Sequence, residues 1–199
     1  MPRETTFDEA AILERARNLF WEKGYTATSI QDLEDTLGIR RSSIYNTFGG
    51  KRQLYDRTLA QYQDENLGRL RSALADSADL RQSLIELFTL AAITVHPECL
   101  TSSRGCYIVN VTTEMANSCT DALNFVSDNR QRFTAILQQA LAGAQDGGQL
   151  REEADPAELA DFLFLCYNGL QVVVQTSVER ESLLRSVTRC IDSLPWTNA

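Results

Sequence analysis

The sequence of residues 28–51 predicts two short helices on either side of a tight turn, and this pattern constrains the fold more than any other part of the chain. Thr28, followed three residues later by Gln31, predicts a capping box at the start of the first helix. Gly38 predicts its end. The apolar stripe of this helix, at spacings of three and four, consists of Ile30, Leu33 and Leu37.

The second of the two helices has one apolar side and one polar side. Ile44 and Phe48 lie one turn apart and are expected to hold the helix against the first one. The side chains that this packing leaves outside are Arg40, Arg41, Ser42, Ser43, Asn46 and Thr47. Arginine, serine, asparagine and threonine suit the donors and acceptors of a DNA major groove. The pattern therefore predicts a helix-turn-helix that reads DNA.

A family resemblance covers residues 7–55. The matching blocks are Ile12 to Gly24, Tyr25-Thr-Ala-Thr-Ser-Ile, Leu37-Gly-Ile and Ser43-Ile-Tyr-Asn-Thr-Phe-Gly-Gly-Lys-Arg-Gln-Leu-Tyr. Together they resemble the DNA-binding domain of the tetracycline-repressor (TetR) family, and Tyr-x-x-Phe-Gly-x-Lys is the most specific part. Where the family often has Ser-Lys-Gly-Ser or Ser-Arg-Gly-Ser, this chain has Arg40-Arg-Ser-Ser and lacks the serine that caps the helix.

Roles in DNA binding follow from chemistry and from this resemblance. Free N–H groups at the start of the first helix, beside Thr28 and Ser29, suit a phosphate, and so does Lys51, which follows two glycines. In the resembling family a tyrosine at the place of Tyr45 touches phosphate. Sequence readout is expected from Arg40, Arg41, Ser42, Asn46 and Thr47. The whole predicted contact set is Thr28, Ser29, Arg40, Arg41, Ser42, Ser43, Tyr45, Asn46, Thr47 and Lys51.

The net charge of −8 is unevenly distributed. Residues 1–60 hold nine Lys and Arg against nine Asp and Glu, which leaves ten against eighteen for the remaining chain. A neutral DNA-reading end with Arg40, Arg41, Lys51 and Arg52 close together can present a local basic patch, while an acidic body discourages non-specific binding. The alternative is that these four charges form an ordinary solvated surface.

The rest of the chain predicts an all-α protein of about nine helices, with a DNA-binding domain at 1–50 and a ligand-binding and dimerisation domain at 51–199. The helices expected after the first domain cover 54–75, 79–96, 105–117, 121–144, 156–177 and 179–194, with a loop at 97–104. No apolar run approaches the length of a membrane span, and no secretion signal is apparent, so we expect a cytoplasmic location. The five cysteines are expected to be thiols.

The expected helix at 156–177 is apolar on almost every side. A helix of that composition must be buried on two sides. In the resembling family the last two helices of each subunit form a four-helix bundle, which implies a twofold homodimer on a palindromic operator. The alternative is a core helix of a monomer.

The second domain is where a ligand site is expected. The expected helix at 105–117 has a polar side, which suits either a pocket wall or solvent; Glu114, if buried, would favour a cationic ligand. Aromatic residues would complete a largely apolar pocket for a small-molecule effector. The candidate ligand residues are Phe88, Cys106, Tyr107, Asn110, Glu114, Phe125, Phe162 and Tyr167. Their alternative reading is an ordinary core and a solvated face.

Cys106 has a second possible role. It is expected at a helix start beside Arg104, and both features favour the reactive thiolate. The segment Arg-Gly-Cys-x-x-Val-Asn resembles a motif in a branch of the family that has members sensing electrophiles or oxidants; the alternative is a cysteine that merely packs. His96, Cys99, Cys106 and Cys119 lack the paired spacing of a metal site, so no metal or other cofactor is expected.

These features predict a transcriptional regulator, most simply a repressor that a small molecule releases from a palindromic operator. The alternative within this class is a thiol-based redox or electrophile sensor that uses Cys106. An enzyme is disfavoured, because the chain has a single His and no nucleophile, phosphate-loop or zinc-protease motif. A third reading is an architectural or partner-binding protein that uses the same helices.

Overall fold

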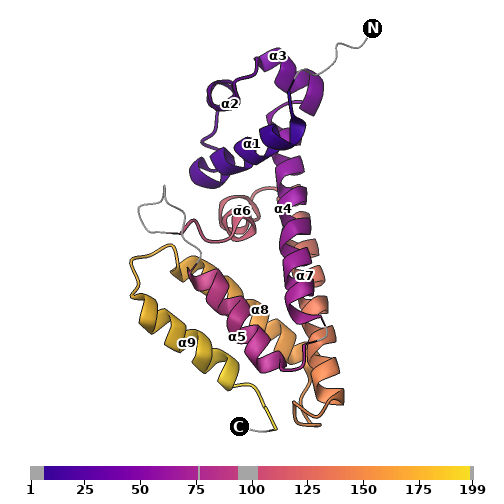
Figure 1. Cartoon of the computed structure of the whole chain (residues 1–199). Helices are drawn as coiled ribbons and strands as arrows, with labels where there is room; N and C mark the ends of the chain where they lie inside the picture. The colour runs from indigo at the N-terminus through magenta and orange to yellow at the C-terminus, as the bar shows by residue number, and fades with distance from the viewer. Residues whose placement is uncertain (1–6, 76, 94–102, 198–199) are drawn as a thin grey trace. The chain divides into compact units, whose positions relative to one another are not determined.

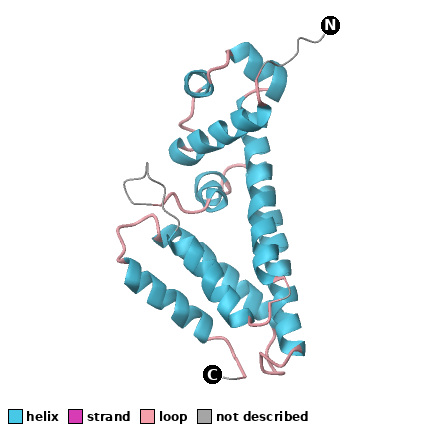
Figure 2. Cartoon of the chain, viewed as in Figure 1, coloured by secondary structure: helices cyan, strands magenta, loops and turns pink. Residues whose placement is uncertain are grey.

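The computed structural model describes residues 7–75, 77–93 and 103–197. Within these ranges every regular element is helical, as Figure 2 shows. The chain divides into two units, residues 1–64 and 65–199, and the division falls inside helix α4 (Lys51–Leu74). No helix among the described residues is both long and apolar enough to cross a membrane.

The first unit contains α1 (Glu9–Lys23), α2 (Ile30–Leu37), α3 (Arg41–Ser43) and the beginning of α4. A π-helical turn (Ile44–Phe48) continues α3, so that residues 41–48 form one recognition helix. Aspartate caps α1, since the Asp8 side chain accepts a hydrogen bond from the Ala10 N–H. The core of this unit consists of Ile12, Ala16, Phe20, Leu33, Leu37, Ile44, Phe48, Leu54, Tyr55, Leu59 and Tyr62.

The second unit contains the end of α4 and five more helices (Figure 1). These are α5 (Leu80–Ile93), α6 (Tyr107–Met115), α7 (Thr120–Asp146), α8 (Pro156–Val173) and α9 (Arg180–Asp192). Its core is built mainly where α7 packs on α8 and where α5 packs on α9. α8 begins as its sequence predicts, because Asp155 caps the N–H groups of Ala157 and Glu158 and Pro156 stands in the first turn.

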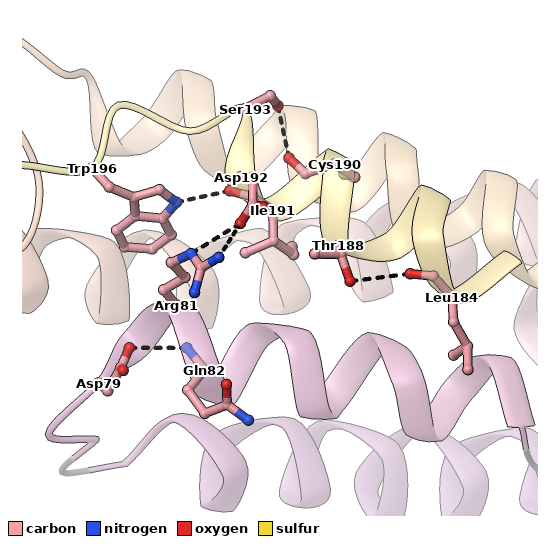
Figure 3. A network of polar contacts seen from close by, with 10 residues as sticks. All are labelled: Asp79, Arg81, Gln82, Leu184, Thr188, Cys190, Ile191, Asp192, Ser193 and Trp196. Atoms are coloured by element: carbon pink, nitrogen blue, oxygen red, sulfur yellow. Dashed lines mark hydrogen bonds and ion pairs between the residues drawn. The ribbon is translucent and has the colours of Figure 1, made fainter. Parts of the chain in front are cut away.

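The segment around the end of α9, up to Trp196, is held beside the start of α5 by a network of polar contacts (Figure 3). The indole of Trp196 donates to the Ile191 carbonyl over 2.8 Å, and Arg81 pairs with Asp192 at 2.5 Å. An isolated antiparallel bridge joins Leu150 to Trp196. The sequence did not predict the Arg81–Asp192 pair or the Leu150–Trp196 bridge, because both join residues that only the fold brings together.

The predicted helices are present, with ends that differ by a few residues. The helix expected at 54–75 begins at Lys51, and the one expected at 156–177 ends at Val173. The helix expected at 105–117 is shorter, because Cys106 is its N-cap and Met115 its last residue. His96, Cys99 and most of the expected loop at 97–104 lie outside the described residues.

Candidate nucleic-acid interface and interior site

The recognition helix presents the predicted polar face to solvent. Ile44 and Phe48 are buried under it. The exposed side chains at its start and along it are Arg40, Arg41, Ser42, Tyr45 and Asn46, and Ser43 and Thr47 are half-buried. Two apolar anchors one turn apart therefore fix which side of the helix faces outward. That side carries Ser42 and Asn46, whose polar groups suit base edges, and two exposed arginines stand at the helix start.

Tyr45 and Lys51 are both positioned by the turn that follows the recognition helix. Gly50 has a φ of +117°, and a Cβ at this residue would lie 3.1 Å from the ring of Tyr45, so only glycine lets the ring rest there. The Tyr45 ring nevertheless stays 52% exposed. Lys51 lies with its Nζ 4.3 Å from the centre of the Tyr25 ring, a cation–π contact. Tyr25 in turn packs against Tyr55.

The start of α2 corrects the expected cap. Ser29, not Thr28, is the N-cap, and it forms a capping box with Asp32 rather than the one predicted with Gln31. Thr28 is buried, and its hydroxyl donates to the Gly24 carbonyl over 2.6 Å. Its side chain is therefore unable to contact DNA, whereas Ser29 is exposed. The sequence misled because Thr28 and Ser29 are both good cap residues and only the position of the first helical residue decides between them.

The carboxylate of Asp32, in the first turn of α2, is paired with a positive charge. Lys23 pairs with Asp32 at 2.7 Å, and the backbone N–H of Ser29 donates to the same carboxylate. These hydrogen bonds, that of Lys23 first, hold the pKa of Asp32 well below its usual range. Asp56 is similarly paired with Arg52 at 2.9 Å. Asp32 and Asp56 thus carry their own counter-charges, which reduces their repulsion of a phosphate backbone.

In the second unit, Tyr167 of α8 lies at the centre of a buried aromatic group. Its ring contacts Phe88 of α5 and Phe133 of α7, at centroid distances of 5.4 and 5.2 Å. Burial is the main reason that the pKa of Tyr167 is raised above its ordinary value, and the nearby Cys106 raises it further. Phe88, Cys106 and Tyr167, three predicted ligand residues, are therefore brought into one interior region.

The other predicted ligand residues are divided. Tyr107 is buried, whereas Asn110, Glu114 and Phe125 are half-buried. Asn110 is engaged, since it donates to the Arg104 carbonyl and accepts from Gln175. Phe162 is 39% exposed on α8, so it does not belong to the buried aromatic group around Tyr167. A nearly all-apolar helix offers no polar residue to mark its outer side, and for this reason the sequence did not separate Phe162 from the residues facing inward.

Two buried amide side chains were not among the ligand residues predicted from the sequence. Gln171 of α8 and Asn129 of α7 are only 5% and 6% exposed. The Asn129 Oδ1 has no hydrogen-bond partner among the described residues. For Gln171 the available signal was an amide within an apolar helical stretch, because such a group is rarely buried without a partner or a ligand. Asn129 stands among charged and polar residues, so its sequence offered no such signal.

An open, mostly apolar pocket of about 310 Å³ lies in the second unit. Phe88, Leu170 and Val187 contribute to its walls together with two cysteines, Cys166 and Cys190. Burial, and then a hydrogen bond with the Cys166 thiol, raise the pKa of Cys190 to about 12. Cys190 is therefore protonated at neutral pH.

The outer side of α8 is apolar and open to solvent. Leu165 is 70% exposed, and Phe162, Val172 and Val173 are exposed beside its buried face. The helix is thus apolar on both sides, with only one side covered by its own chain. Large exposed apolar side chains gathered on one element are typical of an interaction surface.

Two protein-family models match the chain. One, described as bacterial regulatory proteins of the tetR family, matches residues 12–58. The other, described as a tetracyclin repressor-like C-terminal domain, matches residues 97–188. The HTH-type transcriptional repressor ComR of Escherichia coli K12 is 27% identical over 187 residues, which are 92% of this chain and 87% of ComR. YezE of Bacillus subtilis 168, an uncharacterized HTH-type regulator, is 27% identical over 92% of this chain and 94% of its own length.

Solved structures of transcriptional regulators are also similar to this chain. A triple cysteine variant of the TetR family regulator CifR, in complex with a 26-base-pair operator DNA, is 28% identical with a TM-score of 0.84. The similarity covers 97% of this chain and all of that one. Reduced NemR of E. coli, 20% identical over 90% of this chain and 94% of its own, has a TM-score of 0.75 and shares the fold. The chain belongs to the TetR family of bacterial regulatory proteins.

Proposed function

We propose that the protein is a transcriptional repressor that binds a palindromic operator as a homodimer and leaves it when a small molecule binds. The observation that carries this proposal is the recognition helix, whose exposed Ser42 and Asn46 lie opposite the buried Ile44 and Phe48 and whose N-cap is the exposed Arg40. ComR is named a repressor, and the CifR variant is bound to operator DNA, which supports the same role here.

The two ends of the chain are assigned different tasks. Residues 1–50 form the DNA-binding domain and residues 51–199 the ligand-binding and dimerisation domain. The exposed apolar side of α8 supports pairing through α8 and α9, because a second copy would cover Leu165 and Val172. One helix-turn-helix reads few bases, and a twofold pair reads two half-sites about one turn of DNA apart.

We assign the release of operator DNA to a movement of α4. This helix begins at Lys51, a proposed phosphate contact, and continues without a break to Leu74 in the core of the second unit. A ligand that shifts the end of α4 would change the spacing of the two recognition helices. A tenfold loss of DNA affinity requires the ligand to prefer the non-binding arrangement by only about 1.4 kcal/mol.

The effector class follows from the interior of the second unit. Aromatic residues dominate around Tyr167, and the few polar groups near them, such as Gln171, suit a small and largely apolar molecule. Glu114 is only half-buried, which weakens the case for a cationic ligand. We assign the protein no catalytic activity and no cofactor, and place it in the cytoplasm with DNA and the effector as its partners.

A selection experiment tests this function. The full-length protein is incubated with random-sequence DNA duplexes, and the bound fraction is sequenced over several rounds. We expect enrichment of a two-part palindrome with half-sites about one helical turn apart. Absence of any enriched sequence, with the protein folded by circular dichroism, would contradict sequence-specific DNA binding.

The second candidate is a repressor released by oxidation of Cys106. This cysteine is the N-cap of α6, so it lies at the positive end of the helix dipole, which favours the thiolate. Its thiol makes no capping hydrogen bond to the helix. Cys106→Ser would then keep DNA binding but lose release by a hydroperoxide. Release that persists in this variant would eliminate Cys106 as the sensor and favour a reversible ligand.

A further inference from the structure

The recognition helix begins without a cap of its own. Its N-cap residue is Arg40, which makes no side-chain capping hydrogen bond. An arginine side chain has donors only and is unable to accept from the free N–H groups of a helix start. The start of the recognition helix therefore needs an acceptor from elsewhere in the fold.

Glu34 of α2 supplies this acceptor. Its Oε1 accepts a hydrogen bond from the backbone N–H of Arg41 over 2.6 Å. The Glu34 side chain is 23% exposed, so water competes only in part for this contact. A carboxylate at a helix N-terminus is also favoured by the helix dipole, and a charged acceptor makes the stronger kind of hydrogen bond.

The same carboxylate also holds the side chain of Arg41. Its second oxygen, Oε2, lies 3.4 Å from the Nε of Arg41, so both oxygens of Glu34 contact one residue. To reach a base with its full set of donors, Arg41 must give up this pair. Arg40 is exposed and has no ion pair within the described part of the chain, so it keeps its whole charge and its fork of donors for DNA.

We propose that Glu34 is a positioning residue of the DNA-reading surface, which caps the recognition helix and restrains Arg41, and that Arg40 is the arginine that reads a guanine. The inference rests on the proposed function. It divides two neighbouring arginines, equivalent in the sequence, into one that fixes the helix and one that determines specificity.

The test uses the full-length protein and two DNA probes. One is the duplex enriched by the wild-type protein from the random library, and the other is a scrambled duplex of equal composition. Arg40→Ala is expected to weaken binding to the enriched duplex by about 5- to 150-fold, the range of one arginine–guanine contact, with much less effect on the scrambled one. Repeating the selection with this variant is expected to lose one guanine in each half-site.

Arg41→Ala is expected to leave the enriched sequence unchanged and to weaken both probes by a similar factor. If Arg41→Ala instead erases the guanine preference while Arg40→Ala retains it, the assignment of the two arginines is overturned.

Glu34 is tested through a conservative rescue. Glu34→Gln keeps an oxygen that accepts from the Arg41 N–H, so the ratio of affinities for the two probes should stay within about twofold of wild type. Glu34→Ala removes the cap, and this ratio should fall by about fivefold, the effect of losing one helix cap. Asp35→Asn is the matched control, because Asp35 is an exposed acid on the same helix that accepts from Gln31 instead, and it should leave the ratio unchanged.

The role of Glu34 and the proposed function would be contradicted by different results. A wild-type ratio in folded Glu34→Ala, with its folding checked by thermal denaturation, would overturn the role of Glu34. Failure of the wild-type protein itself to enrich a sequence would contradict the proposed function before any variant is measured. The Arg40→Ala comparison remains decisive even if Glu34→Ala fails to fold.

Discussion

Gly105 lies against the backbone of Gln171, so closely that a Cβ on residue 105 would stand 2.4 Å from the Gln171 carbonyl oxygen and equally close to the Gln175 side chain. Gly105 also has a φ of +65°. The segment that leads into Cys106 is thus packed onto the end of α8 at a place where only glycine fits.

Gly105→Ala is therefore expected to lower the free energy of unfolding, by about 1–3 kcal/mol from backbone strain alone, with a further loss from the overlap. Urea denaturation measures the change. Gly143→Ala is the matched control, because Gly143 lies inside α7 with nothing within 4 Å of its Cβ position, and alanine there should stabilise by up to about 1 kcal/mol. Equal effects of the two substitutions would contradict the close approach at Gly105.

Leu165→Glu is expected to convert the proposed dimer into a monomer. The side chain is 70% exposed in one chain, and a charge there would be buried without a partner in a dimer formed through α8. Sedimentation at micromolar concentration should give twice the chain mass for wild type and the chain mass for the variant. Leu123→Glu places the same charge at an exposed leucine of α7 and should stay dimeric; dissociation by this control alone would move the interface away from α8.

Lys51→Ala and Asn46→Ala are expected to affect DNA binding differently. Loss of a phosphate contact at Lys51 should weaken enriched and scrambled duplexes about equally and lower the salt-dependence slope by about one. Loss of a base contact at Asn46 should cost roughly 1–3 kcal/mol on the enriched duplex alone. Fluorescence anisotropy over a range of salt concentrations measures both, with Arg71→Ala as a control for removal of a positive charge from the second unit. Unchanged affinity in both test variants would show that the proposed face is not the one that binds.

Asp32→Asn should destabilise the protein in a pH-dependent way. The folded pKa of Asp32 is held below its unfolded value near 4, so its ionised form contributes stability above that pH, and the contribution is lost as the pH falls toward the folded pKa. The difference in unfolding free energy between wild type and variant should be largest near pH 7 and shrink below about pH 4, at one fixed protein concentration. A difference that stays constant across this range would be inconsistent with the ion pair to Lys23.

Cys190 is expected to react slowly with iodoacetamide in the folded protein. Burial and the hydrogen bond with the Cys166 thiol raise its pKa, so its thiolate at pH 8 is much scarcer than that of an ordinary cysteine. Mass spectrometry after timed alkylation identifies the modified residue, and unfolding in urea should restore normal reactivity. Rapid labelling of Cys190 in the folded state would refute its protonation and bring it into consideration as an oxidant sensor.

The DNA-reading end could be predicted because its signals are local. Ile44 and Phe48 are one helical turn apart, so helix geometry alone places Ser42 and Asn46 on the opposite side. Predicting the cap at Thr28 failed for a local reason too, since a shift of one residue in the helix start exchanges Thr28 for Ser29. The exact first residue of a helix depends on single hydrogen bonds, which the pattern of polar and apolar residues in the sequence does not reveal.

Periodicity and composition by themselves determined that the chain is helical, where its recognition helix lies and that α8 is apolar on almost every side. Only the tertiary structure decided which side of α8 is covered, and with it that Phe162 faces outward while Tyr167 meets Phe88 and Phe133. It also brought Glu34 to the N–H of Arg41, seven residues along the chain. Side-chain spacing within a helix is fixed by its 3.6-residue turn, whereas contacts between helices depend on how each pair packs, which no local pattern encodes.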